Sequence, residues 1–226
     1  MKKFQTVLGI FVMFALATSL SAATIPLWST GICSGLNVTL ANCQGGAGSM
    51  LNYGVPDANY VFSGFSTSDV TIHAVSTYVV DGAGASEWLA PGATAGTLYP
   101  TGSYTVTSTF SLAGFVSSSL TLFLDIAADN DVVAALNGTT ILSCTTGGAT
   151  CFSAFTSNHS INAGALAVAG LNTLTYTVTN EDNPSLTALR VQVQGSANVA
   201  AVPEPGTVML LGIGLAGLGL LRRKTT

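Results

Sequence analysis

Charged side chains are scarce in this sequence of 226 residues: only 7% are Asp, Glu, Lys or Arg, and two residues are His. Five of the six Lys and Arg residues lie within residues 1–23 and 203–226. Residues 24–202 therefore hold nine acidic side chains against one base, Arg190, a formal charge of −8. A nucleic-acid-binding protein needs clustered Lys and Arg to neutralise phosphates, so the sequence excludes this class.

The sequence also lacks the patterns of a hydrolase site. No Gly-x-Ser-x-Gly segment is present, and only His73 and His159 could serve as a base. A glycosidase needs two carboxyl groups about 5–9.5 Å apart, and no spacing among the acidic residues indicates such a pair. We predict that the protein is not an enzyme, with a secreted hydrolase as the alternative.

Residues 1–23 have the pattern of a secretory signal peptide. Lys2 and Lys3 form a positive head, residues 4–20 are mostly apolar, and the small residues before position 24 form a cleavage site. We expect a signal peptidase to cleave after Ala23, within a residue or so, and the remainder to be exported. An uncleaved N-terminal anchor is the alternative.

Two short motifs flank an apolar, glycine-rich run at residues 207–221. They are Val202-Pro203-Glu204-Pro205 before the run and Arg222-Arg223-Lys224 after it. A membrane-spanning helix needs about 20 apolar residues, with a lower limit near 17, which this run reaches only marginally. The basic cluster would stay cytoplasmic and hold the preceding domain outside that membrane.

These parts together, over residues 202–226, resemble the PEP-CTERM sorting signal of Gram-negative bacteria. The resemblance implies export, transient anchoring in the inner membrane facing the periplasm, and processing near the Pro-Glu-Pro motif by an exosortase. Proteins with this tail typically occur in bacteria that make exopolysaccharide and biofilm matrix. The resemblance therefore implies a final place at the cell surface or outside the cell, and an ordinary single-helix anchor is the alternative.

Residues 24–201 have the size of one domain and the period-2 hydrophobic pattern of β-strands. Apolar and polar residues alternate in four runs, followed by a fifth candidate strand: 70–75, 104–110, 119–124, 171–179 and 189–193. Asn137-Gly138 separates two apolar runs and predicts a hairpin, because both residues tolerate positive φ. We therefore predict an all-β domain, either a sandwich or a jelly roll.

The order of motifs between Ser86 and Val193 resembles the galactose-binding-like jelly roll that is common among PEP-CTERM proteins. The motifs are Glu87-Trp88, Gly102 to Phe115, Ala128-Asp129-Asn130-Asp131, Leu136-Asn137-Gly138 and Ala188-Leu189-Arg190-Val191. The resemblance implies a β-sandwich, and that family varies in whether it binds sugar.

Sugar binding needs aromatic faces for stacking and a few polar groups for the hydroxyls. Trp88 and Arg190 are our candidate sugar contacts, with Trp28, Tyr99 and Tyr104 as further aromatic candidates. Core packing is the alternative for each aromatic side chain. Pairing with an acid such as Glu181 or Asp129 is the alternative for Arg190.

Four cysteines in an exported chain predict disulfides, because export leads to an oxidising compartment. Three connectivities are possible. We favour the local pairs Cys33–Cys43 and Cys144–Cys151, each of which closes a glycine-rich loop. The spacings do not fit a zinc site.

The densest acidic cluster is Asp125, Asp129, Asn130 and Asp131. Carboxylate and amide oxygens are ligands for Ca²⁺, although the spacing matches no EF-hand loop. An ordinary turn is the alternative, because Asp and Asn favour turns. We predict no other cofactor.

Four threonines alternate with apolar residues over 173–179 and would share one face of a strand. A flat row of threonines can order water, as some ice-binding surfaces do. The alternative is an ordinary solvated strand face, for which Thr has high propensity.

These features together predict an exported structural or adhesive protein of the cell surface or matrix. Its expected partners are signal peptidase, an exosortase and the inner membrane, with exopolysaccharide as the candidate ligand. A carbohydrate-binding module with a defined sugar site is the alternative, and an ice-binding protein is a further one.

Overall fold

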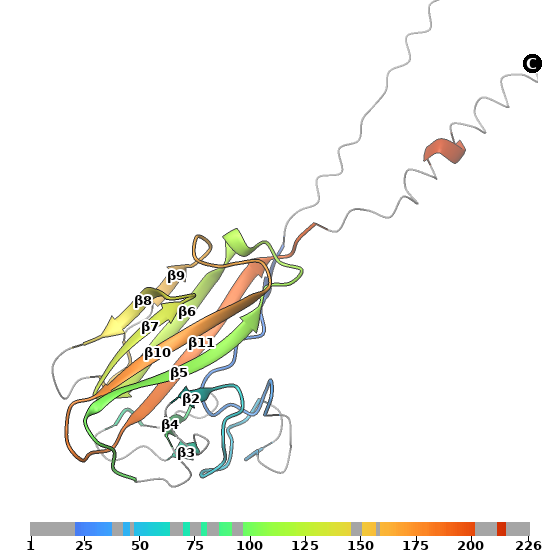
Figure 1. The fold of residues 1–226 in the computed structure, drawn as a ribbon. Coiled ribbons are helices and arrows are strands. Elements are labelled where there is room, and N and C mark those ends of the chain that lie inside the picture. The colour runs from blue at the N-terminus through green and yellow to red at the C-terminus, as the bar shows by residue number, and fades with distance from the viewer. Residues whose placement is uncertain are drawn as a thin grey trace, which may run out of the picture. The chain divides into compact units, whose positions relative to one another are not determined.

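The compact unit between Ala22 and Ala200 contains two antiparallel β-sheets (Figure 1). Sheet I has six strands in the order β3–β4–β11–β6–β9, with β1 also paired to β11. Its strands are β1 (Ala22–Thr24), β3 (Val70–Ile72), β4 (Trp88–Ala90), β6 (Thr121–Asp129), β9 (His159–Asn162) and β11 (Ala188–Asn198). Sheet II has five strands in the order β2–β5–β10–β7–β8. Its strands are β2 (Val61–Ser63), β5 (Gly102–Ser111), β7 (Asp131–Leu136), β8 (Thr139–Cys144) and β10 (Leu171–Asn180).

The computed structural model describes residues 21–37, 43–45, 48–63, 70–72, 78–80, 86–91, 97–145, 151–156, 159–201 and 212–215. The predicted signal peptide before residue 21 lies outside the described residues, as does the predicted sorting signal except for residues 212–215. No helix in the described part of the chain has the length and apolar character needed to cross a membrane.

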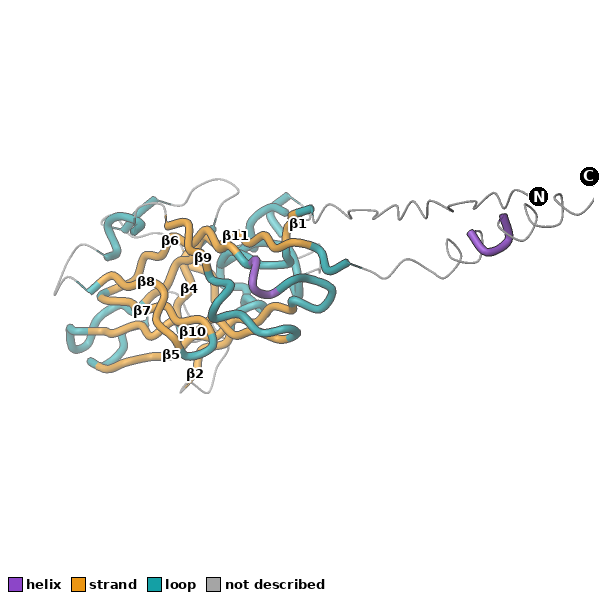
Figure 2. Tube along the Cα trace, turned by 90° about the horizontal axis from the view of Figure 1, so that it is seen from above, coloured by secondary structure: helices purple, strands orange, loops and turns teal. Residues whose placement is uncertain are grey.

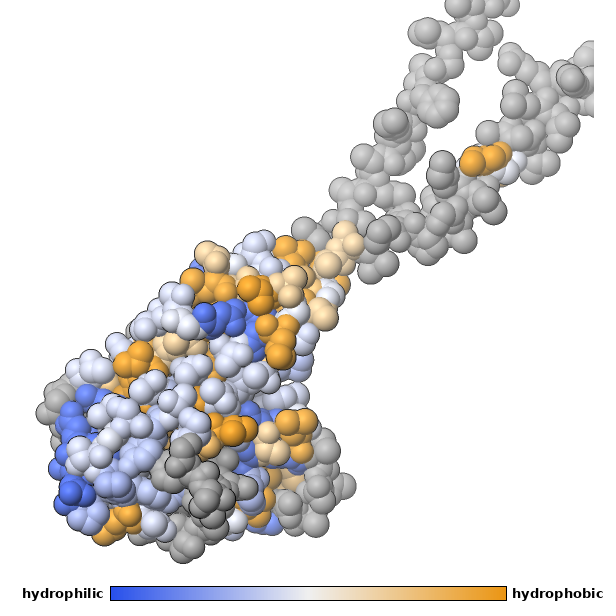
Figure 3. All heavy atoms as spheres, viewed as in Figure 1, coloured by the Kyte–Doolittle hydropathy of each residue, from blue (hydrophilic) through white to orange (hydrophobic). Residues whose placement is uncertain are grey.

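The alternating pattern of the sequence explains the strands, and the predicted all-β class is confirmed. In β10, Leu174, Tyr176 and Val178 are buried, while the threonines between them face outward on sheet II. Figure 2 shows the two layers of strands from above, and the face turned to the viewer in Figure 3 is largely neutral to mildly hydrophilic. The ice-binding alternative built on this threonine row stays a prediction.

The core lies between the two sheets. Leu122, Leu124 and Ile126 of β6 meet the inward side chains of β10, and all of them are fully buried. Burial of such a side chain contributes about 1.5–3 kcal/mol. β6 runs to Asp129, five residues beyond the predicted strand, and its last part is buried on both faces because a second apolar cluster covers the outer face of sheet I.

The predicted hairpin at Asn137-Gly138 joins β7 to β8 and is confirmed. Asn137 has a φ of 48° and Gly138 a φ of 85°, which is the backbone twist that a two-residue hairpin requires. Both predicted disulfides, Cys33–Cys43 and Cys144–Cys151, are also confirmed.

Candidate functional site

The two predicted sugar contacts, Trp88 and Arg190, lie together on the outer face of sheet I, but both are buried. Trp88 is 0% exposed and Arg190 is 1% exposed. Both donate a hydrogen bond to the main-chain carbonyl of Val79, from Nε1 of Trp88 at 3.0 Å and from a terminal nitrogen of Arg190 at 3.1 Å. Neither side chain offers a face to a polymer at the surface, so the predicted contacts would need the covering segments to move.

Two segments cover this pair. The Tyr78 ring lies 4.5 Å from that of Trp88, and the Phe155 ring lies 5.0 Å from the guanidinium carbon of Arg190. Arg190 also donates to Ser86 Oγ at 2.8 Å and to the carbonyl of Val80 at 2.7 Å. The hydrogen-bond partners of this buried cation thus include a hydroxyl and two main-chain carbonyls. The expected pairing with an acid such as Glu181 or Asp129 stays a prediction.

The predicted acidic cluster is divided between the two sheets. Asp125 and Asp129 lie on one face of β6 four residues apart, which is about 13 Å at about 3.3 Å per residue. Asp131 begins β7 in sheet II. Between them, Asn130 accepts a hydrogen bond from the Glu181 amide and donates to Asp182. In the described residues no group of three His, Cys, Asp or Glu side chains is placed to hold a metal ion. The Ca²⁺ site and the ordinary turn both stay predictions.

Asp129 accepts a hydrogen bond from the hydroxyl of Tyr78. Burial raises the pKa of the Asp129 carboxyl above its ordinary value of 3.8, while the Tyr78 hydroxyl acts in the opposite direction. Burial and the adjacent carboxylate also raise the pKa of Tyr78, which stays protonated and keeps donating. The pair therefore fastens the segment at Tyr78 to the end of β6.

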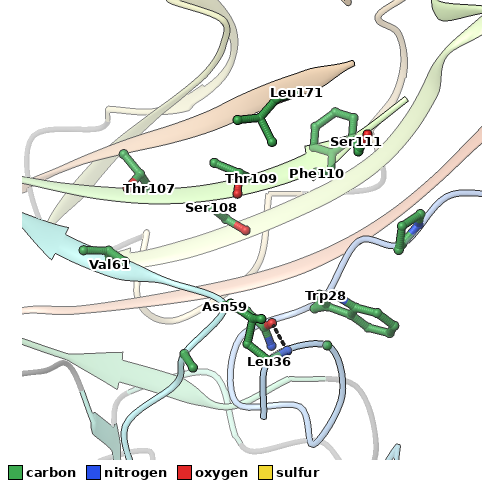
Figure 4. A pocket seen from close by; sticks show the side chains of 13 residues that line it. Trp28, Leu36, Asn59, Val61, Thr107, Ser108, Thr109, Phe110, Ser111 and Leu171 are labelled. Atoms are coloured by element: carbon green, nitrogen blue, oxygen red, sulfur yellow. Dashed lines mark hydrogen bonds between the residues drawn. The ribbon is translucent and has the colours of Figure 1, made fainter. Parts of the chain in front are cut away.

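A groove of about 390 Å³ lies beside Trp28 at the edge of the sandwich (Figure 4). Three strongly exposed apolar side chains, Leu36, Val61 and Leu171, line it together with the half-buried Trp28. Hydroxyl groups of β5 supply its polar wall, from residues 107, 108, 109 and 111. The mixture of an indole, aliphatic side chains and hydroxyls is typical of a small-ligand groove.

Buried polar groups hold the loop that carries one wall of this groove. Asn59 Oδ1 accepts from the Leu36 amide at 2.9 Å, and Asn59 Nδ2 donates to the Ser34 carbonyl at 2.9 Å. Gly35 has a φ of 64°, and a Cβ at this position would overlap the indole nitrogen of Trp28. The glycine therefore allows the loop to approach Trp28 closely.

The buried carboxyl of Asp57 fastens the start of the same loop. It accepts hydrogen bonds from the Gly31 amide at 2.6 Å, from Asn37 Nδ2 at 2.7 Å and from the Asn59 amide at 2.9 Å. Burial raises the pKa of Asp57, while these hydrogen bonds act in the opposite direction. The Asp57 carboxyl therefore holds Gly31, Asn37 and Asn59 together at the start of this loop.

Two further hollows lie along sheet I near its pairing with β1. One, of about 290 Å³, is lined by Trp28, Phe123, Gln192 and Gln194 among others. The second, of about 200 Å³, shares Phe123 and Gln194 and adds the hydroxyls of residues 24, 121 and 196. The sequence analysis did not name Phe123 as a candidate ligand contact. Its place as an aromatic residue on the polar side of an alternating strand could have indicated this role.

None of the side chains that line these three hollows ionises, and all of them belong to the described part of the chain. Hydrolysis of a glycosidic bond needs two carboxyl groups across a cleft. These hollows can therefore bind a neutral ligand through apolar contacts and hydrogen bonds, but they hold no acid or base.

A family model described as the PEP-CTERM protein-sorting motif matches residues 201–224. Residues 201–224 are a PEP-CTERM sorting motif. The motif implies an exported protein that is sorted by an exosortase, as the sequence predicted from residues 202–226. The individual motif residues lie outside the described residues, so their roles stay predictions.

A search of curated proteins found no match. Among solved structures, the chain is similar to a CBM35 from Paenibacillus barcinonensis at 14% sequence identity, with 60% of this chain and 93% of that chain covered and a TM-score of 0.29. At that TM-score the likeness implies nothing about the ligand of this chain, and the galactose-binding-like resemblance stays a prediction.

Proposed function

We propose that this protein is a non-catalytic component of the cell surface or extracellular matrix that adheres to neutral polysaccharide. The PEP-CTERM motif at residues 201–224 is the observation that carries the proposal. The motif accounts for export and exosortase processing, and the β-sandwich of residues 22–200 is the part that remains to act outside.

The chemistry of the grooves supports polysaccharide as the ligand. The grooves combine aromatic side chains with hydroxyl and amide groups and hold no ionisable side chain. A sugar presents C–H faces, which pack on aromatic rings, and hydroxyls, which exchange hydrogen bonds with such groups. The absence of carboxyls from these hollows, all of whose lining residues are described, also supports a non-catalytic role.

Cell fractionation tests the sorting part of the proposal. In bacteria that make the protein, deletion of the exosortase gene should leave the protein in the inner membrane with its tail intact. Wild-type cells should hold a shorter form at the surface or in the medium. Replacement of Pro203, Glu204 and Pro205 by alanine in wild-type cells should reproduce the deletion. Full-length protein in the inner membrane or cytosol of wild-type cells would contradict the proposal.

A carbohydrate-binding module with one defined site is the second candidate function. The groove beside Trp28 favours it, because three exposed apolar side chains gather there around a half-buried indole. Saturable binding of a short oligosaccharide on a glycan array, lost in Trp28→Ala, would support this candidate. Binding only to polymers would favour the adhesive role.

A further inference from the structure

Two aromatic side chains connect the three hollows into a series. Trp28 lines both the hollow of about 390 Å³ and the hollow of about 290 Å³. Phe123, with Gln194, lines both the hollow of about 290 Å³ and the hollow of about 200 Å³. Neighbouring hollows therefore share an aromatic residue, which is an arrangement suited to a ligand longer than one hollow.

The backbone places the segment that carries Trp28 beside β11, the strand that carries Gln192 and Gln194. Residues 25–30 run beside β11, with the Ile25 amide bonded to the Gly195 carbonyl at 3.0 Å and the Thr30 amide to the Val191 carbonyl at 3.0 Å. Ile25 and Leu27 enter the core, and Trp28 remains half-buried at the edge.

Cross-strand pairing places Phe123 of β6 beside the same part of β11. In the register of β6 with β11, Phe123 lies opposite Gln194, and β9 places Ser160 on the other side of Phe123. Paired side chains in neighbouring strands share a face of the sheet with Cβ atoms about 4.5–5.5 Å apart. Phe123 is 37% exposed, so its ring is accessible between the second and third hollows.

The side-chain amides of Gln192 and Gln194 are available to a ligand. In the described part of the chain, the side-chain amides of Gln192 and Gln194 make no hydrogen bond within the protein, and both side chains reach the surface. Each amide can donate and accept at once, which suits adjacent sugar hydroxyls. No charged side chain lines the three hollows, and Asp125, which lies opposite Gln192 in the register of β6 with β11, is buried. An anionic or cationic polymer therefore gains no ion pair from the lining of the hollows.

We propose that the three hollows form one track, here called the Trp28–Phe123 track, which binds an internal stretch of a neutral, linear polysaccharide. Trp28 and Phe123 each stack on a sugar ring, and Gln192 and Gln194 hydrogen-bond to the sugars between and beside them. The inference rests on the proposed function and adds to it the ligand class, an uncharged polymer recognised along its length rather than at its ends.

The test uses the processed protein isolated from the cells that export it. Affinity gel electrophoresis in galactomannan, laminarin, dextran and hydroxyethyl cellulose, with polygalacturonate as an anionic polymer, identifies the polymers that retard it. Calorimetry with oligosaccharides of increasing length from a retarding polymer then measures the affinity. We expect the affinity to rise over several sugar units, and Trp28→Ala and Phe123→Ala each to weaken polymer binding about tenfold, as for loss of an aromatic anchor.

Tyr53→Ala is the matched control, because Tyr53 is also 37% exposed and lines none of the three hollows. It should bind the polymer as the wild type does, and unfolding curves check that all variants are folded. A neutral polymer could retard the wild type and retard Trp28→Ala and Phe123→Ala equally. That result would overturn the track and leave the proposed function standing. An affinity that is already maximal for a single sugar would also overturn the track. Failure of every neutral polymer to retard the protein would overturn both.

Discussion

At the scale of single residues, burial raises the pKa of the Asp57 and Asp129 carboxyls. The folded-state pKa of Asp129 lies above 3.8 because burial disfavours the charged form. Between 3.8 and that raised pKa, the folded state binds more protons than the unfolded state. Stability contributed by this group therefore rises as the pH falls through this window and is lost as the pH rises through the folded pKa.

We expect Asp129→Asn to flatten the pH dependence of the unfolding free energy in this window, since the amide oxygen still accepts from Tyr78 but does not titrate. Urea unfolding at a series of pH values between about 4 and 7 measures the change. Tyr78→Phe is the control: it removes a hydrogen bond that lowers the pKa of Asp129, so it should steepen the dependence. A wild-type profile no steeper than that of Asp129→Asn would contradict the assignment.

At the scale of elements, the Cys144–Cys151 disulfide holds the segment that covers sheet I. The Ala128 amide donates to the Cys151 carbonyl at 3.0 Å, and the Val79 amide donates to the Phe152 carbonyl at 2.7 Å. This segment and Tyr78 together enclose Trp88. The disulfide therefore fastens the cover over a buried aromatic cluster to the end of β8.

Replacement of Cys144 and Cys151 by serine should lower the unfolding free energy by about 2–3 kcal/mol, the cost of freeing a short loop. In a Trp28→Phe background, acrylamide should also quench Trp88 more strongly, because its cover is loosened. The matched control replaces Cys33 and Cys43, which belong to the other disulfide. It should lose stability without the added quenching of Trp88, and equal quenching in both variants would contradict the covering role.

At the scale of the whole molecule, the charged side chains of the domain lie outside the three hollows. Residues 24–202 have a formal charge of −8, yet none of the described side chains that line the three hollows ionises. Excess negative charge keeps anionic polymers away, whereas a neutral polymer meets no electrostatic barrier.

We expect affinity for a neutral polysaccharide to stay constant between about 0.01 and 1 M ionic strength, over which the Debye length falls from about 30 to about 3 Å. Affinity gels cast at both salt concentrations measure it. Polygalacturonate serves as the comparison. It should retard the protein weakly, and the retardation should increase with salt because salt screens the repulsion. A strong fall in binding to the neutral polymer at high salt would indicate charged contacts that the proposal does not contain.

Features set by neighbouring residues were predictable from the sequence. The sorting motif, the alternating strands, the Asn137-Gly138 turn and the two short-range disulfides each depend on a local pattern, a local φ requirement or a short loop. Even for these features, the sequence did not predict every contact. The side chain of Asn137 also bonds to Asn172 and to the carbonyl of Leu166, which are contacts between distant segments.

The tertiary structure alone decided which outward faces stay open. Strand alternation places the Trp88 and Arg190 side chains on the outer face of sheet I. Segments 78–80 and 151–156, which are distant in sequence, cover that end of the sheet and bury both side chains. Farther along the same sheet nothing among the described residues covers Phe123 in this way, and residues 25–30 bring Trp28 beside it. Strand periodicity assigns a side chain to a face, whereas the exposure of that face depends on chain segments remote in sequence.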